Sequence, residues 1–128
     1  MLVPGKMAQV TSTPSHSKTI VLLVETNSDV RARHETLLAS VGYSVLSMAS
    51  FPDVVELQSC AIVIADVPSF LWLQAQQFHN VRPILVIAED CKAGVTACLC
   101  GAADWIPSYG EPDYLLGTIA ETLQQPNA

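Results

Sequence analysis

The chain is poor in charge, and its shortage of basic residues sets the first limit on its function. Only six of the 128 residues are Lys or Arg, and the formal net charge is −6. Nonspecific binding to nucleic acid needs Lys and Arg side chains that neutralise phosphates. The composition therefore predicts no direct nucleic-acid binding by this domain.

Long hydrophobic runs are also missing. No apolar run approaches the roughly 18 residues that suggest a membrane-spanning helix, so we expect no membrane association. Residues 1–18 lack the continuous apolar segment of a secretory signal, and their Ser, Thr and Pro content predicts a flexible tail. The four cysteines have no zinc-type spacing and fit a reduced, cytoplasmic protein.

Half of the residues are hydrophobic, which is enough for one domain over 19–125, with 126–128 as the chain end. Apolar runs alternate with helical patterns, and such alternation predicts a parallel sheet with helices on both faces. The predicted strands cover 19–24, 43–49, 61–66, 83–88 and 104–108, and the predicted helices cover 28–42, 52–58, 70–79, 89–103 and 111–124.

Two buried strands of this pattern lead into acids. Glu25 directly follows the first strand, and Asp66 ends the third. In doubly wound sheets, ligands bind beyond the carboxyl ends of the strands. If the strand order is 2-1-3-4-5, these two strands are neighbours, and we expect the two carboxylates to converge.

The pattern resembles the receiver domain of response regulators, the phospho-acceptor module of two-component signalling. The resemblance implies a flavodoxin-like, doubly wound sheet of five parallel strands in the order 2-1-3-4-5. It also makes Asp66 the phospho-acceptor candidate, and Glu25 with Asp66 the candidate ligands of Mg²⁺. The stretches that carry it are VLLVETNSDVR, LLASVGYSVLSMASFPDVVELQ, AIVIAD, RPILVIAED and GAADWIPSYG.

Several positions depart from the chemistry that the resemblance implies. The family has a pair of acids after the first strand, and Thr26 stands in place of one of them. Ala88 replaces the family's hydroxyl residue, Ser108 replaces its Lys, and the large Trp105 occupies the position of its switch aromatic. Losing one carboxylate lowers the charge available to Mg²⁺, so we expect no required cofactor and at best weak Mg²⁺ binding.

We therefore predict an atypical receiver, or pseudo-receiver, that acts without phosphorylation as a protein–protein interaction module and not as an enzyme. A protein partner, or a second copy in a homodimer, would dock on the fourth helix, fifth strand and fifth helix. The fourth helix has no charge between Lys92 and Asp104, and exposed apolar patches usually mark interfaces. The candidate interface residues are Val95, Thr96, Trp105, Tyr109, Tyr114 and Thr118.

Alternatives stay open at this point. Asp66 is the acceptor of an ordinary receiver served by a histidine kinase, an inherited structural residue, or a cap for the following turn. Glu25 is a metal ligand or a solvated acid, and Trp105 is a rotameric switch or a packing residue. A flavodoxin-like small-molecule binder would need a glycine-rich phosphate loop after the first strand, and VETNSDV contains no glycine.

Overall fold

Five parallel strands form a single sheet in the order β3-β2-β4-β5-β6. Counted along the chain, this is the predicted order 2-1-3-4-5, and the doubly wound fold is confirmed. The strands are β2 (Ile20–Val24), β3 (Ser44–Met48), β4 (Ile62–Asp66), β5 (Ile84–Ala88) and β6 (Asp104–Pro107). The computed structural model describes residues 19–51, 60–76 and 82–124; the predicted tail, second helix and chain end lie outside these residues.

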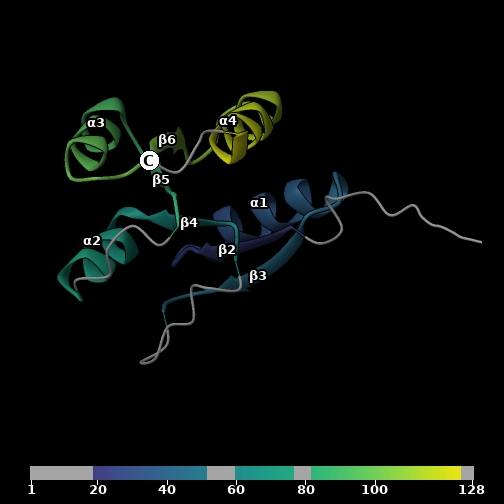
Figure 1. Ribbon diagram of the computed structural model, residues 1–128, viewed down its shortest axis with the longest axis horizontal. Helices are drawn as coiled ribbons and strands as arrows, with labels where there is room; N and C mark the ends of the chain where they lie inside the picture. Colours follow the sequence, from purple (N-terminus) through teal and green to yellow (C-terminus); the bar gives the residue numbers. More distant parts are fainter. Residues whose placement is uncertain (1–18, 52–59, 77–81, 125–128) are drawn as a thin grey trace, which may run out of the picture.

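The described helices cover both faces of this sheet (Figure 1). On one face lie α1 (Ser28–Ser40) and α4 (Pro112–Gln124), and on the other lie α2 (Val67–Ala75) and α3 (Cys91–Leu99). The arrangement agrees with the predicted α/β layers. Within the described part of the chain, no helix is long and apolar enough to cross a membrane.

The continuous apolar runs of the central strands reflect burial on both faces. In β2, Leu23 packs in the cluster under α1 and α4, whereas Leu22 packs in the cluster under α2 and α3. In β4, Ile64 and Val63 divide in the same way. Because side chains alternate along a strand, only an unbroken apolar run can satisfy both layers.

The caps of α1 follow the sequence pattern. The side chain of Asn27 accepts hydrogen bonds from the backbone N–H groups of Asp29 and Val30, which satisfies two free donors of the first turn. After the helix, Gly42 adopts φ 99°, a left-handed conformation that suits glycine. Both features confirm the predicted start and end of this helix.

The buried side of α1 is formed by few residues. Val30 and Leu38 are buried, whereas Val41 is 40% exposed because it is the C-cap residue. His34 is buried in its place, and its Nδ1 lies 2.8 Å from the carbonyl oxygen of Val30. Burial lowers the pKa of His34 below its ordinary value, so the imidazole is neutral.

Helix α2 begins earlier than predicted. We expected a helix over 70–79, whereas α2 starts at Val67, directly after β4. The cause is Asp66, whose side chain caps the helix by accepting the N–H of Ser69, with Pro68 in the first turn. Asp66 therefore both ends β4 and caps α2.

Candidate functional site

The carboxyl ends of the strands meet at one edge of the sheet and form the floor of a cleft. In the ladder, Val24 pairs with Ala65, and Asp66 pairs with Ile87. The cleft above this edge has a volume of about 580 Å³. The cleft brings together the two predicted acids, Glu25 and Asp66, with Thr26 and Ser108. Its lining consists of Glu25, Thr26, Asn27, Asp66, Val67, Pro68, Ile87, Glu89, Asp90, Ala93 and Ser108.

Asp66 is buried at the floor of this cleft and is held by backbone donors. The N–H of Thr26 donates to Oδ2 at 2.8 Å, and the N–H of Ser69 donates to Oδ1 at 2.8 Å. Burial alone would raise the pKa of Asp66, but the hydrogen bonds from Ser69 and Thr26 outweigh it and lower the pKa below its ordinary value. Asp66 is thus an ionised residue that ties the end of β2 to the start of α2.

Glu25 lies beside Asp66 and is only 5% exposed, so the expectation of a solvated strand-end acid is wrong. Its Oε2 accepts the N–H of Asn27 at 3.0 Å, while Arg31 bonds its backbone oxygen instead of its carboxyl group. Burial raises the pKa of Glu25 to about 7; the Asn27 bond opposes this shift, and neighbouring Asp66 adds to it. Below about pH 7, Glu25 therefore carries a proton.

These residues do not fit a tight magnesium site. Mg²⁺ prefers near-octahedral oxygen coordination, with carboxylates that compensate its charge. The side chain of Thr26 has no carboxylate to offer a metal ion, and Glu25, with its pKa raised to about 7, is protonated below that pH. In the described ranges, no group of three or more His, Cys, Asp or Glu side chains is placed to hold a metal ion.

Ala88 and Ser108, which differ from the residues that the receiver resemblance implies, also lie at this edge. Ala88 ends β5 and is buried, so it offers the cleft no hydroxyl group. Ser108 lines the cleft and donates its N–H to the carbonyl oxygen of Ala88 at 3.1 Å. Glu89 lines the cleft, and so does Asp90, whose carboxylate caps α3 by accepting the N–H of Ala93 at 2.8 Å.

Trp105 lies away from the residues that line the cleft. It pairs with Val86 in the ladder, two residues before the end of β6, and its side chain belongs to the cluster under α2 and α3. The indole ring covers Gly94 of α3 so closely that a Cβ atom at position 94 would overlap it. This placement fits the packing role that we considered for Trp105.

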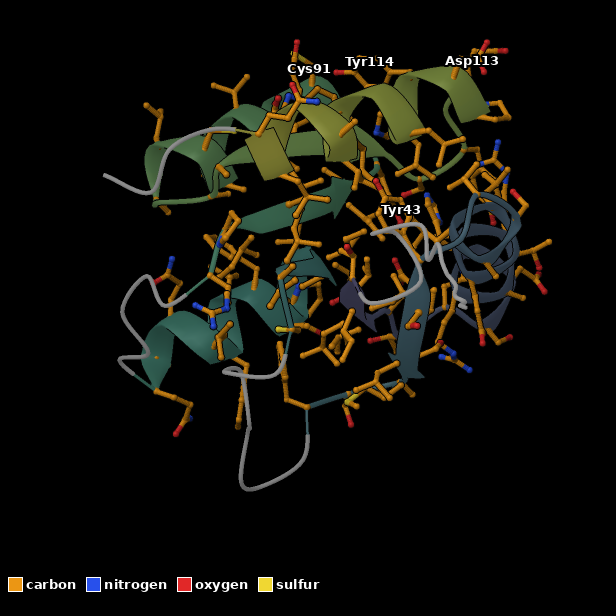
Figure 2. All side chains as sticks on the ribbon, turned by 45° about the vertical axis from the view of Figure 1, so that its right-hand side comes forward. Tyr43, Cys91, Asp113 and Tyr114 are labelled. Carbon is orange, nitrogen blue, oxygen red and sulfur yellow. The ribbon has the colours of Figure 1, made fainter. Side chains whose placement is uncertain are left out.

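The candidate interface residues divide into exposed and buried ones. Val95 and Thr96 of α3 are exposed, and so are Tyr109 and Tyr114. Figure 2 shows Tyr114 at the outer edge of the molecule, pointing away from the sheet. Thr118 is buried, and its hydroxyl donates to the carbonyl oxygen of Tyr114 at 2.8 Å, so including Thr118 among the candidate interface residues was wrong.

One contact at the rim was missed by sequence reasoning. Arg33 of α1 donates from Nη2 to the carbonyl oxygen of Gly110 at 2.6 Å, and its guanidinium lies 5.9 Å from the centre of the Tyr109 ring. The partners are 77 residues apart, so no local pattern announces the contact. This hydrogen bond links the loop after β6 to α1. Tyr109 of the same loop lines a second cleft, of about 430 Å³.

Comparison with solved structures assigns this architecture. The HemR receiver domain of Leptospira biflexa has a TM-score of 0.70 at 17% identity, covering 87% of this chain and 98% of its own. The fold is that of a receiver domain. A response regulator receiver protein from Burkholderia phymatum gives a TM-score of 0.68 at 21% identity, with 86% and 98% covered. The chemotaxis response regulator CheY4 of Vibrio cholerae gives 0.65 at 20% identity, with 81% and 98% covered.

At these identities, the likeness establishes the receiver fold and does not transfer the chemistry of the neighbours. No protein-family model matches the chain, and no curated protein matches it. A shared fold does not determine a function, which depends on the residues of the site.

Proposed function

We propose that this chain is an atypical receiver that signals through protein contacts, without phosphorylation of Asp66 and without catalysis of its own. The observation that carries the proposal is the engagement of the Asp66 carboxylate. Both of its oxygens accept backbone N–H groups at 2.8 Å, one from Thr26 and one from Ser69. The carboxylate thereby stabilises the loop after β2 and the first turn of α2.

The surrounding cleft supplies few of the groups that phosphoryl transfer needs. That reaction depends on positioning and on positive charge that neutralises the transferred group. Of the described residues that line the cleft, none is Lys or Arg, whereas Glu89 and Asp90 add acidic side chains. A phosphoryl group on Asp66 would therefore lie among carboxyl groups without a neutralising side chain.

A reconstitution experiment tests this proposal. Protein is incubated with acetyl phosphate and Mg²⁺, and the intact mass is measured. We expect the wild type to keep its mass. The triple variant Thr26→Asp, Ala88→Thr, Ser108→Lys supplies the carboxylate, hydroxyl and ammonium groups that the cleft lacks, and we expect it to gain one phosphoryl group.

The matched control is the same triple variant carrying Asp66→Asn, which should stay unmodified. Circular dichroism checks the fold of each variant, because Asp66→Asn removes an acceptor from the N–H of Thr26. Phosphoryl transfer to Asp66 in the wild type would overturn the proposal. It would favour an ordinary receiver that takes its phosphate from a histidine kinase.

The proposed output surface consists of the exposed side chains of α3, of the loop after β6 and of α4, and it binds a protein partner. Tyr109 and Tyr114 supply exposed aromatic side chains there, and Val95 supplies an exposed aliphatic one. Aromatic residues are enriched and charges are depleted at the centres of interfaces. In the organism of origin, Tyr114→Arg should abolish signalling and Asp66→Asn should preserve it; the reverse pattern would identify phosphorylation as the signal.

A further inference from the structure

A groove lies between α2 and α3, on the flank of α3 that faces away from β6. Its volume is about 340 Å³. Val67, Phe70 and Leu71 of α2 form one wall, and Thr96 and Cys100 of α3 belong to the other. Phe70 is fully buried, whereas Leu71 is exposed at the rim. The groove is therefore a mainly apolar surface that is open to solvent, with the charged residues Asp90 and Lys92 also in its lining.

The same helix carries a projecting apolar side chain. Leu99 is 83% exposed, the largest value among the exposed large hydrophobic residues of the described part of the chain. Val95, one turn earlier, is 46% exposed. Lys92, which lines the groove, precedes Leu99 by seven residues, about two helical turns, so both share the outer face of α3. One helix thus presents both a knob and the wall of a groove.

We propose that two copies of this chain associate through this face, with their α3 helices antiparallel and Leu99 of each inserted into the α2–α3 groove of the other. A two-fold axis near Val95 and Thr96 brings position 99 of one copy level with position 92 of the other. The inference goes beyond the proposed function because it names a second copy as the partner and adds the α2–α3 groove, which the proposed output surface does not include.

Self-complementarity distinguishes a second copy from an unrelated partner. In a two-fold interface, residue i of one copy contacts residue j of the other, and j contacts i in return. A projecting side chain and a groove on the same helix can therefore each find their partner in the other copy. A single-sided partner would fill the groove and leave Leu99 in water. The antiparallel arrangement makes both contacts twice with the same residues.

Charge supports the same arrangement. Helix α3 has no basic residue in its last turn, so its partly negative carboxyl end lacks a cation of its own. In the antiparallel pair, Lys92 of one copy lies near that end of the other. No charged residue between Lys92 and Asp104 opposes the approach, although each chain carries a net charge of −6. Asp90, at the start of α3, is already engaged by the N–H of Ala93.

The first test is Leu99→Lys, which would bury an ammonium group in an apolar groove beside Lys92 of the other copy. Because Leu99 is exposed in a single copy, the substitution leaves the core unchanged. By sedimentation equilibrium, we expect the wild type to dimerise with a dissociation constant of roughly micromolar size. Leu99→Lys should raise that constant by at least about tenfold.

A second variant tests the geometry. Adding Lys92→Glu to Leu99→Lys places opposite charges at the two positions that the two-fold axis brings level, so the double variant should recover the dimer. Tyr114→Arg on α4 is the matched control and should leave the dimer intact.

Two results would overturn the proposal. One is a wild type that stays monomeric at about 100 µM, well above a micromolar constant. The other is a dimer that resists Leu99→Lys but dissociates with Tyr114→Arg, because its contact would then involve α4. Neither result bears on the phosphorylation experiment, which reads the mass of one chain.

Discussion

Replacing Glu25 with Gln should make the stability of this protein less dependent on pH. Burial raises the pKa of Glu25 in the folded protein from 4.5 to about 7. The folded state therefore keeps a proton that the unfolded state releases between these values. The stability from this proton is fully present below about pH 4.5 and is lost as the pH rises through about 7.

The magnitude follows from the size of the shift. The difference between about 7 and 4.5 is about 2.5 pKa units, which at about 1.36 kcal/mol per unit corresponds to about 3 kcal/mol. Asp66 acts in the opposite direction, because its lowered pKa provides stability that is lost only under acidic conditions. Of the other charged groups near Glu25, Arg31 favours the ionised form, whereas Glu89 and Asp90 line the same cleft as acids.

Urea denaturation at about pH 5 and about pH 8 measures this effect. Between these conditions, we expect the wild type to lose up to about 3 kcal/mol of unfolding free energy and Glu25→Gln to lose clearly less, since Gln cannot ionise. Glu89→Gln is the control, because Glu89 is exposed and should leave the profile unchanged. Parallel pH profiles for the wild type and Glu25→Gln would refute the view that Glu25 retains its proton.

Other substitutions test the packing and the floor of the cleft. In thermal unfolding, Gly94→Ala should destabilise the fold by about 1–3 kcal/mol, because the added methyl group would overlap Trp105. Gly117→Ala, at an exposed position of α4, is the control and should stabilise the fold by about 0.5–1 kcal/mol. Equal effects of the two substitutions would contradict this packing. Asp66→Ala should cost about 2–4 kcal/mol by removing a helix cap and the acceptor for Thr26, and a neutral result would deny Asp66 its structural role. By calorimetry, Mg²⁺ should bind with a dissociation constant in the millimolar range or above, and a submillimolar site removed by Asp66→Asn would contradict this.

The fold could be predicted from the sequence because its signals are local and repeated. Continuous apolar runs mark strands buried on both faces, and the helical stretches between them require parallel crossovers. The predicted helix starts at residue 70 because its bounds follow the apolar pattern, although a cap by Asp66 was one of the roles considered for that residue. The spacing of Asp66, Pro68 and Ser69 also matches a helix cap, and that cap moves the helix start to Val67.

The site could be predicted only in outline. The convergence of Glu25 and Asp66 followed from the order of the strands, and the absence of a hydroxyl at Ala88 followed from its identity. The burial of Glu25 and of Thr118 did not follow, because it depends on packing among residues far apart in the chain. The bond between Arg33 and Gly110 has the same origin.

The contact between Gly94 and Trp105 bears on the order in which the molecule folds. Helix α3 has nine residues, too few to be stable alone, and a glycine in its interior costs about 1 kcal/mol relative to alanine. The helix gains its main support when β6 brings the indole ring against Gly94. We therefore expect α3 to form after β6 has joined the sheet and to open before β5 does, so its amides should exchange hydrogen faster than those of the central strands.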